Sequence, residues 1–109
     1  MSFRVIPSDK FKKEAKRLIK KFPSLKNELF NLGTTLANEP KAGTMLGNNT
    51  FKIRLAIKSK GKGKSGGTRI ITYVVTEDNE VYLLTIYDNS EFDNVDVKTI
   101  KYTIETLKS

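Results

Sequence analysis

The chain has 109 residues, enough to bury one modest core, and its 38% hydrophobic and 29% charged residues are typical of a globular protein. It has no cysteine and no histidine, which excludes disulfides, thiolate metal sites and every histidine-based catalytic triad. No apolar run is long enough for a membrane span or a signal peptide. We therefore expect one domain over residues 1–109, located in the cytoplasm.

Positive charge is concentrated in the N-terminal part of the chain. Residues 1–76 contain 17 Lys or Arg and 4 Asp or Glu, whereas residues 77–109 contain 3 and 8. No acidic residue lies between Pro40 and Thr76. Such a block of one sign favours an anionic partner, most simply nucleic acid, although a solvated basic surface gives the same composition.

The first third of the sequence predicts a short strand and then a helical hairpin. Phe3–Ile6 alternates and is ended by Pro7, and Ser8 is a good N-cap for a helix to about Lys21. Pro23-Ser24 breaks and recaps the chain before a second helix to about Ala37. Both helices carry an apolar face, formed by Phe11, Ala15, Leu18, Ile19 and Phe22 in the first and by Leu25, Leu29, Leu32 and Leu36 in the second.

From residue 51 the apolar period changes to two, which is typical of strands. In the segment 51–58 every odd position is apolar, and the even side carries Lys52, Arg54 and Lys58. Two further β-branched runs, residues 68–76 and 80–87, are joined by a turn.

A final helix is predicted from about Asn94 to Leu107, with Val97, Ile100, Ile104 and Leu107 on one side. The order of elements indicates an α+β fold. We expect an antiparallel sheet with an N-terminal helical hairpin and a C-terminal helix.

A glycine-rich basic segment, residues 58–67, separates the first two of these three strands. Gly63-Lys64-Ser65 resembles the end of a P-loop, but Lys58 stands where that pattern requires glycine, and a strand follows instead of a helix. A basic hairpin loop fits better, and its lysines are candidates to bind RNA phosphates: Lys58, Lys60, Lys62 and Lys64. A solvated loop without a partner is the alternative.

The exposed side of the strands is a candidate catalytic site. Lys52 and Arg54 point the same way, and a hairpin places Arg69 beside Arg54 or Lys58. Tyr87 ends the third strand, at the rim of the sheet. Cations beside an aromatic ring suit a phosphodiester, because arginine stabilises a pentavalent phosphorane and tyrosine stacks on a base. Ordinary surface charge is the competing interpretation.

Three segments resemble the RelE/ParE toxin superfamily and, within it, HigB-like members of type II toxin–antitoxin systems. They are Phe51-Lys-Ile-Arg-Leu-Ala-Ile57, Gly61-Lys-Gly-Lys-Ser-Gly-Gly-Thr-Arg-Ile70 and Val81-Tyr-Leu-Leu-Thr-Ile-Tyr87. The resemblance covers nearly the whole chain. It implies a RelE-like toxin that cleaves mRNA on the ribosome without a metal or other cofactor and is blocked by a cognate antitoxin.

Carried over residue by residue, the resemblance makes Arg54, Arg69 and Tyr87 the catalytic candidates, with Lys52 beside them. The implied reaction is attack of a ribose 2′-OH on the adjacent phosphate.

One position departs from the family pattern, in which a lysine follows the tyrosine by two residues. Here that position is Asn89, which cannot act as a cation or as a proton carrier. An attenuated enzyme, or a catalytically dead module that binds its antitoxin, is therefore an alternative. A toxin of the same fold that acts on DNA gyrase, as ParE-like members do, is another.

Overall fold

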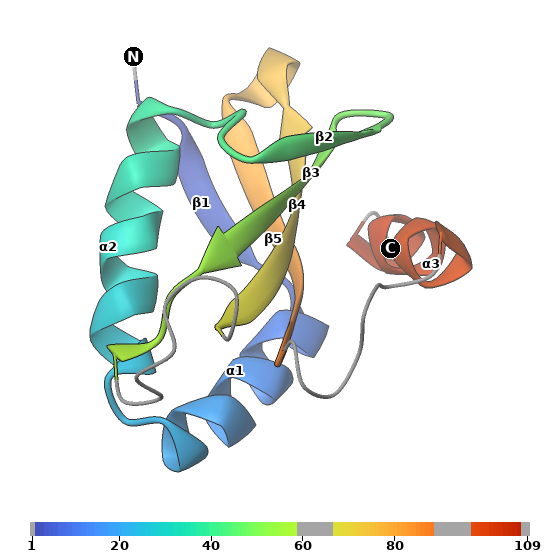
Figure 1. Ribbon diagram of the computed structural model, residues 1–109. Coiled ribbons are helices and arrows are strands. Elements are labelled where there is room, and N and C mark those ends of the chain that lie inside the picture. Colours follow the sequence, from blue (N-terminus) through green and yellow to red (C-terminus); the bar gives the residue numbers. More distant parts are fainter. Residues whose placement is uncertain (1, 59–66, 89–96, 108–109) are drawn as a thin grey trace.

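The computed structural model describes residues 2–58, 67–88 and 97–107 (Figure 1). The predicted RNA-binding residues Lys60, Lys62 and Lys64, and Asn89, lie outside the described residues.

The N-terminal elements form where the sequence predicts them. Strand β1 (Arg4–Pro7) leads into helix α1 (Asp9–Lys21), and α2 (Leu25–Asn38) follows. Ser8 caps α1, since its hydroxyl oxygen accepts a hydrogen bond from the Phe11 amide at 3.1 Å. Ser24 stands at the N-cap position of α2, but its hydroxyl does not cap that helix.

The predicted helical hairpin is confirmed only in part, because α1 and α2 follow one another directly and touch, but each packs mainly on the sheet. In Figure 1 they meet at a corner instead of lying along one another, with α1 against β5 and α2 against β1. Their apolar faces pack onto the sheet, because Leu18, Leu25 and Leu36 are fully buried in one cluster with strand residues. A sheet offers more apolar area than a second narrow helix does.

The sheet has five strands in the order β1-β5-β4-β3-β2, and it is mixed instead of purely antiparallel. β3 (Thr50–Leu55), β4 (Thr68–Val75) and β5 (Glu80–Asp88) are antiparallel neighbours, as expected. β1 is parallel to β5, which corrects the expectation of an antiparallel sheet. The long connection through α1 and α2 lets β1 enter the sheet in either direction, so local sequence does not determine its orientation.

One strand was not predicted. β2 (Thr44–Gly47) pairs antiparallel with β3 at the edge of the sheet, where Met45 and Leu46 are exposed. It is too short to show an alternating pattern. Asn48 and Asn49 connect it to β3, and both have positive φ, as a tight two-residue hairpin turn requires.

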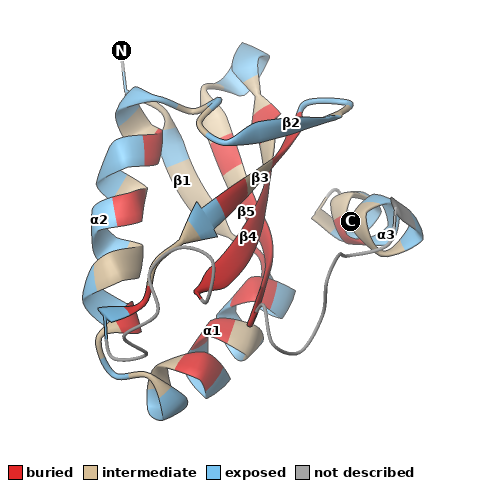
Figure 2. Ribbon diagram, in the orientation of Figure 1, coloured by how far each residue is buried: buried red, intermediate tan, exposed pale blue. Residues whose placement is uncertain are grey.

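The two faces of the sheet are covered differently (Figures 1 and 2). Helices α1 and α2 cover one side, which we call the helix face. Helix α3 (Val97–Leu107) lies against the other side through Ile100, Ile104 and Leu107, which are only partly buried. Among the described residues, no helix is both long and apolar enough to span a bilayer.

Candidate functional site

Three of the four predicted catalytic residues form one row across the sheet. Arg54 on β3 pairs with Arg69 on β4, and Arg69 pairs with Tyr87 on β5. Residues directly opposite in antiparallel strands project to the same side. Lys52 precedes Arg54 by two residues and therefore shares that side, opposite Ile71 in the next row. We call this side, opposite the helix face, the cation face.

A β-bulge in β5 brings Tyr87 to this row. Thr72 pairs with Leu83, but Ile71 pairs with Thr85, so β5 has one extra residue at this point. Without the extra residue, the register would place Arg69 opposite Ile86 and turn Tyr87 toward the helix face. The bulge inverts the alternation, so that Ile86 joins the large core and Tyr87 joins the cation face.

Glu14 of α1 holds the bulge from the helix face. Its carboxylate accepts hydrogen bonds from the Thr85 hydroxyl at 2.6 Å and from the Ile86 amide at 3.3 Å. A carboxylate that binds both groups satisfies polar atoms that the irregular ladder leaves without their usual strand partners. Sequence patterns gave no sign of this role.

The row becomes more buried toward β5. Arg54 is exposed, Arg69 is 5% exposed, and Tyr87 is 2% exposed. The Arg69 guanidinium donates a hydrogen bond to the Thr68 carbonyl at 3.2 Å. Arg54 and Arg69 are cations paired in register, so a phosphate group bound beside both would be attracted by two positive charges.

Tyr87 is a neutral phenol at physiological pH. Burial raises its pKa above the ordinary value of 10.0, and the positive charge of Arg69 only partly opposes this shift. The hydroxyl therefore donates a hydrogen bond or a proton near pH 7 and does not act as a phenolate base. The ring is almost fully buried beside Arg69, so little of it is exposed for stacking.

The remaining lysine candidates differ in position. Lys52 is half-buried on the cation face. Lys58 is exposed beyond the end of β3, outside the row, and its backbone amide donates to the Glu28 carboxylate of α2 at 2.7 Å. That contact ties the chain to α2 where the strand ends, which explains why β3 stops at Leu55 and not at Lys58 as predicted.

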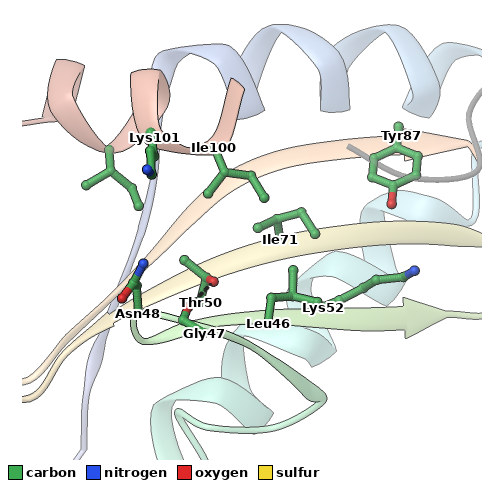
Figure 3. Close-up of a pocket in the computed structure, with 10 residues that line it drawn as sticks. Leu46, Gly47, Asn48, Thr50, Lys52, Ile71, Tyr87, Ile100 and Lys101 are labelled. Atoms are coloured by element: carbon green, nitrogen blue, oxygen red, sulfur yellow. Dashed lines mark hydrogen bonds between the residues drawn. The ribbon is translucent and has the colours of Figure 1, made fainter. Parts of the chain in front are cut away.

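Sequence reasoning also missed a cavity of about 220 Å³ next to the row (Figure 3). It opens between α3 and the cation face, and we call it the α3 cavity. Lys52 and Tyr87 line it together with residues that were not predicted as site residues, among them Asn48, Ile71, Ile100 and Lys101. These residues come from a turn, a strand and a helix, so no local pattern links them.

Comparison with known proteins shows the fold. No protein-family model matches the sequence. Among solved structures, the chain is similar to the E. coli toxin RelE, in a form with two arginines changed to alanine and in the free state, with a TM-score of 0.64 and 15% sequence identity. The match covers 97% of this chain and 98% of that one. The chain therefore has a RelE-like fold, and its activity has to be argued from its own residues.

Proposed function

We propose that this protein is the toxin of a type II toxin–antitoxin system, an endoribonuclease that cleaves mRNA on the ribosome. The row of Arg54, Arg69 and Tyr87 carries the proposal. Two opposed guanidiniums beside a neutral phenol bind and polarise a phosphodiester, whereas a toxin of this fold that acts on DNA gyrase has no need of such a site. The RelE-like fold is consistent with the proposal.

In the proposed reaction, a ribose 2′-oxygen attacks the adjacent phosphorus. A base accepts the 2′-OH proton as the bond from the 2′-oxygen to phosphorus forms. The bond from phosphorus to the 5′-oxygen of the next nucleotide breaks, and an acid donates a proton to that oxygen. Arg54 and Arg69 bind the non-bridging oxygens and stabilise the negative charge of the phosphorane. Lys52 and Tyr87 are the candidate proton carriers in a chain without histidine, and the step requires no metal ion.

Induction of the protein in bacteria, followed by mapping of transcript ends, tests the proposal. We expect new ends inside coding regions, in phase with codons, because the ribosome presents the message one codon at a time. Intact transcripts together with DNA damage would instead indicate a gyrase poison. Intact transcripts and intact DNA would indicate a catalytically attenuated module that binds its antitoxin.

The partner in this proposal is an acidic antitoxin encoded next to the gene. A protein of net charge +8 that attacks cellular RNA is most simply silenced by carboxylates that cover its cations. A pull-down from the native host should recover the small product of a neighbouring gene, and association of the purified pair should slow as salt increases. Failure to recover such a product would contradict the toxin–antitoxin assignment.

A further inference from the structure

The α3 cavity lies on the cation face and extends away from the row of Arg54, Arg69 and Tyr87. Along β3, Lys52 and Thr50 precede Arg54 by two and four residues and lie in the next two rows of the sheet. Asn48 follows beyond Thr50, at the tip of the turn between β2 and β3. Lys52, Thr50 and Asn48 all line the cavity. A group bound in it is therefore adjacent to a phosphate held by the arginines.

The walls of the cavity are apolar and its ends are polar. Ile71 of β4 and Ile100 of α3 lie between the two ends in Figure 3. Asn48 and Lys101 lie toward one end, and Tyr87 and Lys52 toward the other. Apolar walls with a few fixed polar groups are the usual features of a site for a flat organic ring.

Asn48 is held in place by its backbone. Its φ of 50° is in the left-handed region, and Asn49 next to it has a φ of 62°. The Asn49 carbonyl accepts a hydrogen bond from the Val74 amide at 2.9 Å, and the Thr50 hydroxyl donates to the Gly47 carbonyl. These bonds hold the backbone of the turn, so the Asn48 side chain starts from a fixed position at the end of the cavity.

We propose that the α3 cavity binds one unstacked base of the RNA, next to the cleaved phosphate, and that Asn48 selects which base is accepted. This inference rests on the proposed function, since it places the base beside a phosphate on Arg54 and Arg69. The ring lies in the cavity with Ile100 along its wall. The Asn48 amide has both a donor and an acceptor, which match a neighbouring acceptor and donor on the edge of a base. Recognition of single-stranded RNA commonly uses such extruded bases.

The test compares Asn48→Gly with Asn49→Gly. Glycine adopts positive φ without strain, so each change removes a side chain and preserves the turn. Asn49 lies in the same turn but outside the lining of the α3 cavity, which makes it the matched control. Both variants are assayed for cleavage of a transcript library, and the base preference around each cut is measured.

We expect Asn48→Gly to reduce the preference for one base at one position near the cut by about tenfold, the usual order for one pair of hydrogen bonds to a base edge. Cleavage at sites with the preferred base should fall relative to cleavage at sites with the other bases. Asn49→Gly should keep the parent preference. An identical preference in the parent and in Asn48→Gly would overturn the inference.

A binding measurement separates this inference from the nuclease assignment. The four ribonucleoside 5′-monophosphates are added to the protein, and the methyl NMR signals of Ile71 and Ile100 are followed, with Ile70 on the helix face as the internal control. At least one nucleotide should shift both cavity signals, whereas inorganic phosphate, bound at the neighbouring arginines, should leave the Ile100 signal in place. If the signals shift but the protein cuts no transcript, base binding in the cavity would be supported and the nuclease assignment would be contradicted. If the protein cuts transcripts but no nucleotide shifts the signals, base binding in the cavity would be contradicted and the nuclease assignment would stand.

Discussion

The two faces of the sheet differ in what they contribute. On the helix face, a continuous apolar cluster joins α1, α2 and four strands, with Leu18, Leu25, Leu36, Ile70 and Ile86 fully buried in it. On the cation face, the buried hydrophobic cluster consists of Ile71, Leu84 and Tyr87, with partly buried residues of α3 packed against it. Arg54 and Arg69 lie on the same face. Most of the hydrophobic stabilisation therefore comes from one face.

This division separates the stabilising core from the site in a chain of 109 residues. The row of cations lies on the face that contributes less apolar burial, and the core on the helix face supplies most of the stabilisation. Glu14 connects the two faces, since it lies on the helix face and holds the bulge that aligns the row on the other side.

The largest expected effect is on the helix face. Leu18→Ala should reduce the free energy of unfolding by about 2–5 kcal/mol, because Leu18 is 0% exposed and its removal leaves a cavity in the main core. The same substitution at the exposed Leu46 on β2 should change the free energy by less than about 0.5 kcal/mol. Urea denaturation of both variants measures the contrast. Similar losses in the two would contradict the division between the faces.

Arg69→Ala should have its largest effect on activity. Removal of one preorganised charge contact typically reduces a rate by about 10²–10³. The free energy of unfolding should also fall, because the buried guanidinium and its hydrogen bond to the Thr68 carbonyl are lost, but the protein should remain folded.

Cleavage rates and urea midpoints of Arg69→Ala are compared with those of Arg17→Ala, which removes the same charge from the exposed surface of α1. Parent-level cleavage by a folded Arg69→Ala protein would exclude this residue from the site.

Asn89→Lys tests the position, two residues after Tyr87, where the sequence departs from the lysine of the RelE-like pattern. If a lysine at this position acts as a general acid or base, cleavage and toxicity should rise by about 10²-fold. Growth inhibition and transcript cleavage are measured at matched expression, with Asn89→Gln as the uncharged control. Equal toxicity of the lysine variant and the parent would show that this position is outside the chemistry.

The smallest expected effect is that of Glu14→Ala, which acts on the site from the other face. Loss of the hydrogen bonds to Thr85 and Ile86 should let the bulge relax and should reduce cleavage by about tenfold, which corresponds to one charge-assisted hydrogen bond. Glu14→Gln retains an acceptor and should restore most of the rate.

Two-dimensional NMR of the Tyr87 ring signals gives the second measurement for Glu14. They should move in Glu14→Ala and stay in place in Lys10→Ala, which removes only the partner of Glu14 in its exposed salt bridge on α1. Unmoved ring signals in Glu14→Ala would show that the bulge does not depend on this carboxylate.

Much of the fold could be predicted because local signals are strong. The Ser8 cap, the apolar faces of the first two helices and the alternation after residue 51 each depend on neighbours in sequence. The strand β2 could not be predicted, since four edge residues, three of them exposed, are too few to show a pattern. The direction of β1 could not be predicted either, because its partner is more than 70 residues away in the chain.

For the site, the sequence by itself determined the residue types: cations on one side of a strand, Arg69 after a glycine pair, and Tyr87 at the end of a strand. Simple alternation from Val81 and Leu83 would turn Tyr87 into the main core. Only the tertiary structure places Tyr87 on the cation face. One extra residue in β5, whose backbone is held by Glu14 of α1, reverses which side of the sheet Ile86 and Tyr87 face. The α3 cavity has the same origin, since it exists only where Asn48, Ile71 and Ile100 are brought together by packing.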